Sequence, residues 1–134
     1  MTKRFLLFIV FTLALLSQAI AQESSYKLLV FEGSDWCSNC IRFNKTIMTD
    51  KTVSLFLSEH NIEREHIDFP QRKELDAETK SYNASVAEKY NFKGLFPTIL
   101  LVDNETDAVV EIVYQNQDSK TFIDLLKSYI KSDE

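Results

Sequence analysis

The sequence predicts an α/β domain in which a mixed, four-stranded sheet lies between layers of helices, a three-layer α/β/α arrangement. Three observations predict this fold class. Strand-like apolar runs alternate with helical segments, the first strands are joined through helices, and a short turn-forming run joins the last two strands. Strands joined through a helix pair in parallel by right-handed crossovers, whereas a hairpin adds an antiparallel strand. The sheet is therefore expected to be mixed.

The first half of the domain supplies two strands with a helical region between them. Residues 26–32 are largely apolar and predict a buried strand, and the spacing of apolar residues predicts a helix over 37–48. A second helical segment follows, for which Asp50 or Thr52 can provide the N-cap. Residues 62–69 predict the second strand.

The second half adds a helix, a hairpin and a closing helix. A charged amphipathic helix is expected over 74–90, a third strand over 99–102, and a fourth over 108–114. Asp118 or Ser119 can cap the closing helix. Its expected core-facing residues follow helical spacing: Phe122, Leu125, Leu126, Tyr129 and Ile130.

Residues 1–21 differ in composition from the rest of the chain. Two basic residues precede an apolar run over 5–16, and the small residues at 19–21 suit a signal peptidase, so we predict a secretory signal peptide. An uncleaved membrane anchor is disfavoured because a bilayer needs about 20 apolar residues. The expected domain is 22–134, with no membrane association after cleavage. We expect export, with the periplasm as the preferred destination.

The acidic composition argues against some classes of partner. The whole chain has 15 basic and 20 acidic residues, and loss of the two basic residues of the signal peptide leaves a net charge of −7. Such a charge disfavours nucleic acid and anionic membrane surfaces. The remaining length suits one domain with a single core, which we expect to be a monomer.

The only two cysteines, Cys37 and Cys40, lie one helical turn apart, directly after Trp36 and at a predicted helix N-terminus. Unpaired N–H groups and the helix dipole stabilise a thiolate at that position. An exported protein can also hold a structural disulfide, but a bridge that closes so small a loop stabilises little. The spacing therefore favours redox chemistry.

Four further segments belong with the cysteine pair: Gly33 to Cys40, Asp68-Phe69-Pro70, Lys89-Tyr90, and Gly94 to Thr98. Together these motifs resemble the thioredoxin superfamily, and more closely its exported thioredoxin-like members. The resemblance implies a thioredoxin fold and thiol-disulfide exchange with protein or peptide substrates. It implies that Cys37 is the nucleophile, that Cys40 is the resolving thiol, and that no cofactor is needed. An unidentified redox protein would be the electron partner.

The resemblance also implies a substrate-binding surface beside the cysteines. In the family, a proline with a cis peptide bond abuts the cysteine pair, and here that residue is Pro97. The residues alone would favour a trans proline at the start of an edge strand. Phe96 is expected to shape the peptide groove, and Trp36 to offer an apolar surface beside the sulfur.

Two departures from the family pattern concern the chemistry. Many thioredoxins have a buried aspartate six residues before the first cysteine, and that position is Phe31. Glu32 should point to the opposite face of the strand, and we interpret it as a solvated charge. No acceptor for the proton of Cys40 is therefore evident. Ser38-Asn39 replaces the usual Gly-Pro, so reductase, oxidase and isomerase activities stay open.

Two other functions remain as alternatives. Paired thiolates select Cu(I), so a metal-binding, copper-chaperone-like role is possible for this fold, and a non-catalytic protein-binding module is another. No second cysteine pair completes a zinc site. We interpret the two histidines, His60 and His66, as surface polar residues rather than ligands. Ile41 follows Cys40, which excludes a c-type haem motif.

Overall fold

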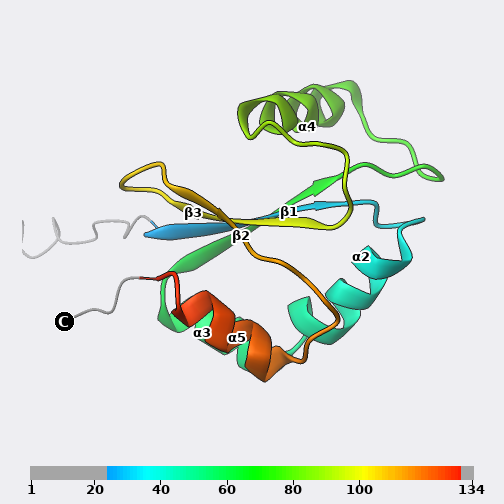
Figure 1. The fold of residues 1–134 in the computed structure, drawn as a ribbon. Helices are drawn as coiled ribbons and strands as arrows, with labels where there is room; N and C mark the ends of the chain where they lie inside the picture. The colour runs from blue at the N-terminus through cyan, green and yellow to red at the C-terminus, as the bar shows by residue number, and fades with distance from the viewer. Residues whose placement is uncertain (1–23, 131–134) are drawn as a thin grey trace, which may run out of the picture.

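The computed structural model describes residues 24–130, so the predicted signal peptide lies outside the described residues. A four-stranded sheet forms the centre of the domain, and helices cover both of its faces (Figure 1). The elements are β1 (Tyr26–Glu32), α2 (Ser38–Phe43), the π-helix η1 (Asn44–Met48), α3 (Lys51–Glu59), β2 (Ile62–Asp68), α4 (Ala77–Lys89), β3 (Thr98–Asp103), β4 (Val109–Glu111) and α5 (Ser119–Lys127).

The strand order is β2-β1-β3-β4. β1 pairs in parallel with β2 and antiparallel with β3, and β4 is an antiparallel neighbour of β3. The predicted mixed sheet and three-layer fold class are confirmed. Thr98 pairs with Phe31 and Asp68 with Glu32, so the segments that leave β1 and β2 and the segment that enters β3 meet at one end of the sheet.

Each face of the sheet has its own hydrophobic core. Leu28 and Val30 of β1 point toward α2, η1, α3 and α5, where Phe43 and Phe122 are fully buried. The intervening residues of β1 point toward α4: this smaller core contains Leu29, Phe31, Ile67, Val86, Leu100 and Val102. Figure 1 shows the same division, with α4 alone on one side of the sheet. The alternation of side chains along β1 therefore fills both cores.

Some boundaries differ from those expected. The helix predicted over 37–48 becomes a π-helix at Asn44, where the hydroxyls of Thr46 and Thr49 donate to carbonyls four residues back. Asp76 accepts the N–H of Thr79, so α4 begins at Ala77. The fourth strand is shorter than expected, although the N–H of Ile112 still donates to the carbonyl of Ile99.

The closing helix is also shorter than predicted. α5 ends at Lys127, and the hydroxyl of Ser128 donates to the carbonyl of Leu125 just beyond the end. Tyr129 lies past this point and is exposed, so its expected place in the core is wrong. Phe122 and Leu126 are fully buried as predicted.

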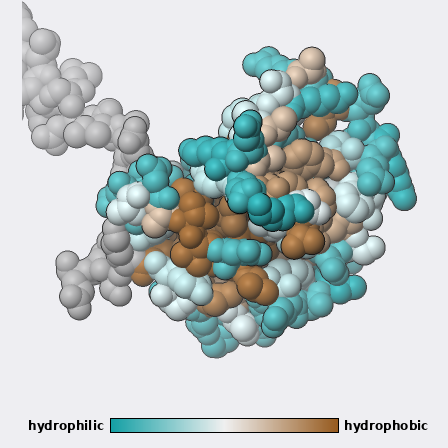
Figure 2. Space-filling model, turned by 45° about the horizontal axis from the view of Figure 1, so that its top comes forward, coloured by the Kyte–Doolittle hydropathy of each residue, from teal (hydrophilic) through white to brown (hydrophobic). Residues whose placement is uncertain are grey.

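Both hydrophobic and hydrophilic residues reach the surface. In a view with the top of Figure 1 turned forward, hydrophobic residues gather in the middle of the face and hydrophilic residues surround them (Figure 2). Within residues 24–130, no helix combines the length and apolar character needed to cross a membrane.

Candidate active site

The two cysteines form a disulfide where the chain enters α2. Cys37 is the N-cap residue of the helix, and its Sγ accepts the backbone N–H of Cys40 at 3.2 Å. Their Cα atoms are 5.2 Å apart. Cys37 is 7% exposed whereas Cys40 is 0% exposed, so Cys37 presents the more accessible sulfur. This is the asymmetry that a nucleophile and a resolving thiol require.

A tight turn before the cysteines depends on a glycine. The carbonyl of Gly33 accepts the backbone N–H groups of Trp36 and Cys37, at 3.3 and 2.9 Å. The indole of Trp36 then folds back over Gly33. A Cβ atom on Gly33 would lie only 2.4 Å from Cε2 and Nε1 of Trp36, so no larger residue fits without displacing the ring. Glycine is therefore needed here for close approach.

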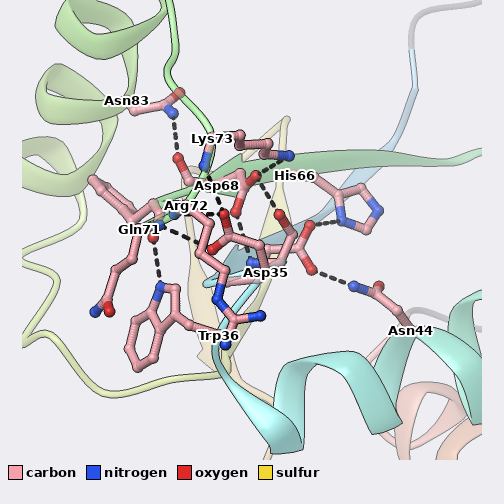
Figure 3. Close-up of polar contacts among 12 residues, drawn as sticks. Asp35, Trp36, Asn44, His66, Asp68, Gln71, Arg72, Lys73 and Asn83 are labelled. Carbon is pink, nitrogen blue, oxygen red and sulfur yellow. Dashed lines mark hydrogen bonds and ion pairs between the residues drawn. The ribbon is translucent and has the colours of Figure 1, made fainter.

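Asp35 joins this turn to the segment that follows β2. Its Oδ1 accepts the N–H of Gln71 at 2.9 Å, and its Oδ2 accepts the N–H groups of Arg72 and Lys73 at 2.8 and 2.9 Å (Figure 3). The N–H of Gln71, followed by those of Arg72 and Lys73, lowers the pKa of Asp35 from its usual value. An ionised Asp35 therefore holds three consecutive backbone groups.

Asp68 makes a second set of contacts between the same two segments. Its carboxylate accepts the N–H and the hydroxyl of Ser34 at 2.9 and 2.6 Å and pairs with Nζ of Lys73 at 2.7 Å. Burial opposes ionisation, but the ion pair with Lys73 and the bonds from Ser34 lower the pKa of Asp68 overall. Trp36 Nε1 donates to the carbonyl of Phe69 at 2.8 Å. We call residues 33–36 and 68–73 the hydrogen-bonded wall.

Aromatic rings form a second group of contacts, continuous with the hydrogen-bonded wall through Trp36. Phe92 contacts Phe31, Phe69 and Phe96 at centroid distances of 4.4, 5.8 and 5.1 Å. The edge-on contact of Phe96 with Trp36, at 5.2 Å, completes this group. We call Trp36, Phe69, Phe92 and Phe96 the aromatic wall. It brings together the two aromatic residues that the sequence suggested for substrate contact.

Pro97 directly precedes β3 and follows a cis peptide bond from Phe96, the isomer that the family resemblance implies. Because Thr98 pairs with Phe31, Pro97 lies beside the end of β1, from which the cysteine segment departs. Leu95, two residues earlier, is 69% exposed, and its carbonyl accepts the hydroxyl of Thr98 at 2.8 Å.

The interpretation of Glu32 as a solvated charge is wrong. Glu32 is 5% exposed and lies between the sheet and the helix that follows the cysteines. One carboxylate oxygen accepts the side-chain amide of Asn44, and the other lies 2.9 Å from Nδ1 of His66 (Figure 3). His66 is partly exposed, but it contacts a buried acid rather than only solvent. His60 packs edge-on against Phe56.

The sequence reasoning missed the roles of Asp35 and Asp68. Both residues belong to the motifs that carried the family resemblance, yet their contacts join positions more than 30 residues apart. The sequence did contain a signal: Asp35 follows the end of the first strand and Asp68 ends the second. Parallel pairing of these two strands brings their ends together. Among the described residues, no group of three or more histidine, cysteine, aspartate or glutamate side chains could hold a metal ion.

Comparison with known proteins agrees with this geometry. A family model described as thioredoxin-like matches residues 17–104. The disulfide bond reductase DsbH of Chlamydia pneumoniae is 26% identical over 103 residues, which are 77% of this chain and 61% of that protein. The chain thus spans less than two thirds of that relative.

Solved structures show the same fold. A structure of the DsbH oxidoreductase matches with a TM-score of 0.71 and 25% identity, over 80% of this chain and 73% of that one. The C-terminal domain of Neisseria meningitidis DsbD in the reduced form matches with a TM-score of 0.54 and 15% identity, over 90% and 95% of the two chains. With the family model covering most of its length, the chain belongs to the thioredoxin-like family.

Proposed function

We propose that this protein is a thiol-disulfide oxidoreductase that exchanges disulfides with protein or peptide substrates through Cys37 and Cys40. The observation that carries the proposal is the asymmetry of the pair. Cys37 is the more accessible sulfur at a helix N-cap, whereas Cys40 is fully buried one turn later. A pair arranged in this way can attack a substrate through one sulfur and release it through the other.

The exchange proceeds in two steps from the reduced protein. The thiolate of Cys37 attacks one sulfur of a substrate disulfide, forms a mixed disulfide, and releases the other substrate sulfur as a thiolate. Cys40 then attacks the sulfur of Cys37, and the second substrate sulfur leaves with the bonding electron pair. Two electrons pass to the substrate, and the protein is left with the Cys37–Cys40 disulfide present here.

We infer that reduction is the working direction. One matching relative is named a disulfide bond reductase, and one matching solved structure is named an oxidoreductase. A reductase must be reduced again after each turnover, so a second redox protein supplies two electrons. That partner would meet the same surface as the substrate, because the accessible sulfur belongs to Cys37.

We infer that the substrate contacts the aromatic wall and the neighbouring Pro97. Trp36 and Phe96 meet edge-on beside the cysteine turn, and Pro97 borders the end of β1. An apolar surface of this kind shields a mixed disulfide from water and accepts apolar side chains of an unfolded or extended peptide. We assign Trp36, Phe96 and Pro97 to substrate binding.

We further propose that the protein is exported, with the periplasm as its destination and Gln22 as the mature N-terminus. The composition of residues 1–21 supports this. N-terminal sequencing of protein from the periplasmic fraction tests it, and recovery of an intact Met1 form in the membrane fraction would contradict it.

The activity is tested by insulin reduction together with covalent trapping. The wild-type protein should accelerate insulin precipitation in the presence of a thiol reductant. Cys40→Ser should trap substrates as mixed disulfides, and the matched Cys37→Ser should trap few and lose the activity. Equal trapping through Cys40 in Cys37→Ser would reverse the assignment. Absence of wild-type activity, together with stoichiometric Cu(I) binding by the reduced protein, would favour the copper-binding alternative.

A further inference from the structure

A pocket of about 460 Å³ lies between the segment that follows β2 and the first half of α4. Its volume is within the range of sites that hold small ligands, about 300 to 1,000 Å³. Residues 68–75 line one side, and Lys80 and Asn83 of α4 line the other. The two-step exchange gives this pocket no role, although its lining includes residues 68–73 of the hydrogen-bonded wall.

The turn that carries the cysteines lies next to this pocket. The carboxylate of Asp35, two residues before Cys37, accepts the backbone N–H groups of residues 71–73. Two residues span at most about 7 Å of chain, so this part of the lining lies close to Cys37. Figure 3 shows the Arg72 side chain running from the lining toward the turn that carries Trp36. A protein joined to Cys37 can therefore reach the mouth of the pocket.

Asn83 presents an unused hydrogen-bond acceptor to the pocket. The residue is 4% exposed, and its Nδ2 donates to the carbonyl of Asp68 at 2.8 Å, which fixes the orientation of the amide. Within residues 24–130, Oδ1 accepts no hydrogen bond, yet no completely enclosed side-chain oxygen or nitrogen in that range lacks a partner. Oδ1 is therefore open to the pocket. Because buried polar groups are nearly always paired, this oxygen indicates a ligand with a hydrogen-bond donor.

Two cations of the lining have no counter-ion. In the part of the chain that the structure describes, the side chains of Arg72 and Lys80 form no ion pair, whereas Lys73 pairs with Asp68 at 2.7 Å. Glu74 is the other acid of the lining. Three basic and two acidic side chains give the lining a charge of +1, although the whole chain carries −5. The lining therefore favours an anionic ligand.

These features together define the chemistry of the ligand. A carboxylate suits the unpaired cations, since a guanidinium binds it through two parallel hydrogen bonds. An N–H donor suits the Asn83 oxygen, and carbon atoms suit the apolar part of the lining, which is Phe69, Pro70 and Leu75. Aspartate or glutamate within a peptide provides the carboxylate, the backbone N–H and the methylene groups. Inorganic phosphate provides only the charge.

We propose that an acidic segment of the protein substrate docks in this pocket while the substrate disulfide reacts at Cys37. The inference rests on the proposed exchange reaction and adds the class of substrate: proteins with aspartate or glutamate near the reacting cysteine. Arg72 binds one carboxylate at the mouth of the pocket, and Lys80 binds another on the α4 side. Complementary charge raises the rate of encounter between the two proteins.

The first test compares two peptides that differ only in charge. One has Asp and Glu beside a single cysteine, the other has Asn and Gln at the same positions, and each cysteine is joined to a coloured aromatic thiol. Attack by Cys37 of the fully reduced protein on the peptide sulfur releases this thiol, which stopped-flow absorbance measures. At low salt the acidic peptide should react about 10-fold faster. Added salt should shrink this preference, because it screens the charges.

Variants of the two cations locate the effect. Arg72→Gln and Lys80→Gln should each lower the preference about threefold, and the double variant should remove it, while the uncharged peptide reacts at the wild-type rate. Lys51→Gln is the matched control: it removes the same charge from the start of α3, which packs on the opposite face of the sheet from α4. An unchanged preference in the double variant, or an equal loss in Lys51→Gln, would overturn the proposal.

The second test measures binding without thiol chemistry. The probe is the cysteine-free peptide Ac-Asp-Glu-Asp-NH₂, added to the oxidised, ¹⁵N-labelled protein. The NMR signals of the Asn83 side-chain amide and of the N–H groups of residues 71–73 should shift in a saturable way, and Arg72→Gln should weaken the binding about threefold. Ac-Asn-Gln-Asn-NH₂ should cause no shifts. No shifts with the acidic peptide, or equal shifts and affinity with inorganic phosphate, would overturn the proposal.

The two tests separate the docking site from the exchange reaction. If neither peptide releases the aromatic thiol but the acidic probe binds at Asn83, the exchange reaction fails and the docking site stands. If both peptides react at one rate and the probe does not bind, the exchange reaction stands and the docking site is overturned.

Discussion

The hydrogen-bonded wall and the aromatic wall border the same disulfide, but different forces hold them. In the first, Asp35 and Asp68 fix backbone and side-chain donors at 2.6 to 2.9 Å, so position depends on the direction of individual bonds and on ionisation. In the second, ring centroids lie 5.1 to 6.0 Å apart, so position depends on shape and volume. Trp36 and Phe69 belong to both. Ser34 and Asp35 fasten the cysteine turn within the first wall, and the Trp36 ring joins it to the second.

The largest effect is expected where volume is removed from the aromatic wall. Phe92 contacts three other rings, and Phe92→Ala would leave a gap between the sheet and the loop before β3. Because the ring is only partly buried, we expect the free energy of unfolding to fall by about 3 kcal/mol, the lower end of the range for Phe→Ala in a core. Chemical denaturation measures it. The matched control is Leu95→Ala, whose exposed side chain should contribute within about 0.5 kcal/mol.

The second effect comes from adding volume where the two walls meet. Gly33→Ala places a methyl group against the Trp36 ring, which must then leave the carbonyl of Phe69 and the edge of Phe96. We expect overpacking to lower the free energy of unfolding by about 2 kcal/mol. The rate of insulin reduction should also fall strongly. Trp36 is the only tryptophan, so its fluorescence reports the displacement directly.

Gly94→Ala is the control for the second effect. Gly94 has φ +75°, and a Cβ atom added there would meet nothing within 4 Å, so alanine is strained at this position without contacting a ring. It should lower stability by about 1 kcal/mol and leave the fluorescence of Trp36 unchanged. An unchanged Trp36 spectrum in Gly33→Ala would show that the ring does not depend on the glycine.

The sequence predicted the apolar parts of this molecule better than the polar ones. The period of apolar residues located the buried first strand and the core-facing side of the closing helix, because burial leaves a pattern in every helical turn or in alternate strand residues. The cysteine pair, Trp36 and Phe96 were found through a local motif. Glu32 was misjudged because its burial is decided by partners on η1 and β2. Asp35 and Asp68 were missed for the same reason: a long-range hydrogen bond leaves no periodic trace.

A smaller effect tests the hydrogen-bonded wall. In Asp35→Asn, one oxygen becomes an NH₂ group, so whichever way the amide turns, a donor faces at least one of the N–H groups of Gln71, Arg72 and Lys73. The segment should open more often and be cut by trypsin after Arg72 and Lys73 faster than in wild type. Asp76→Asn is the control, since asparagine caps α4 as well as aspartate does. Equal cleavage rates in both variants would show that Asp35 does not hold the segment.

The smallest expected effect is the pH dependence of the difference in Tm between wild type and Asp35→Asn. The backbone N–H of Gln71, then those of Arg72 and Lys73, keep the pKa of folded Asp35 below its usual 3.8. A group with a lowered folded pKa stabilises the protein above the unfolded pKa, and this contribution is lost as the pH falls through the folded pKa. The Tm gap between wild type and Asp35→Asn should therefore be constant near neutral pH and should close below about pH 4. The other carboxylates change the Tm of wild type and of Asp35→Asn equally as the pH falls, so their contributions cancel in the difference. A gap that persists or widens in acid would mean that the charge of Asp35 does not hold the wall, and that the contacts depend only on the shape of the side chain.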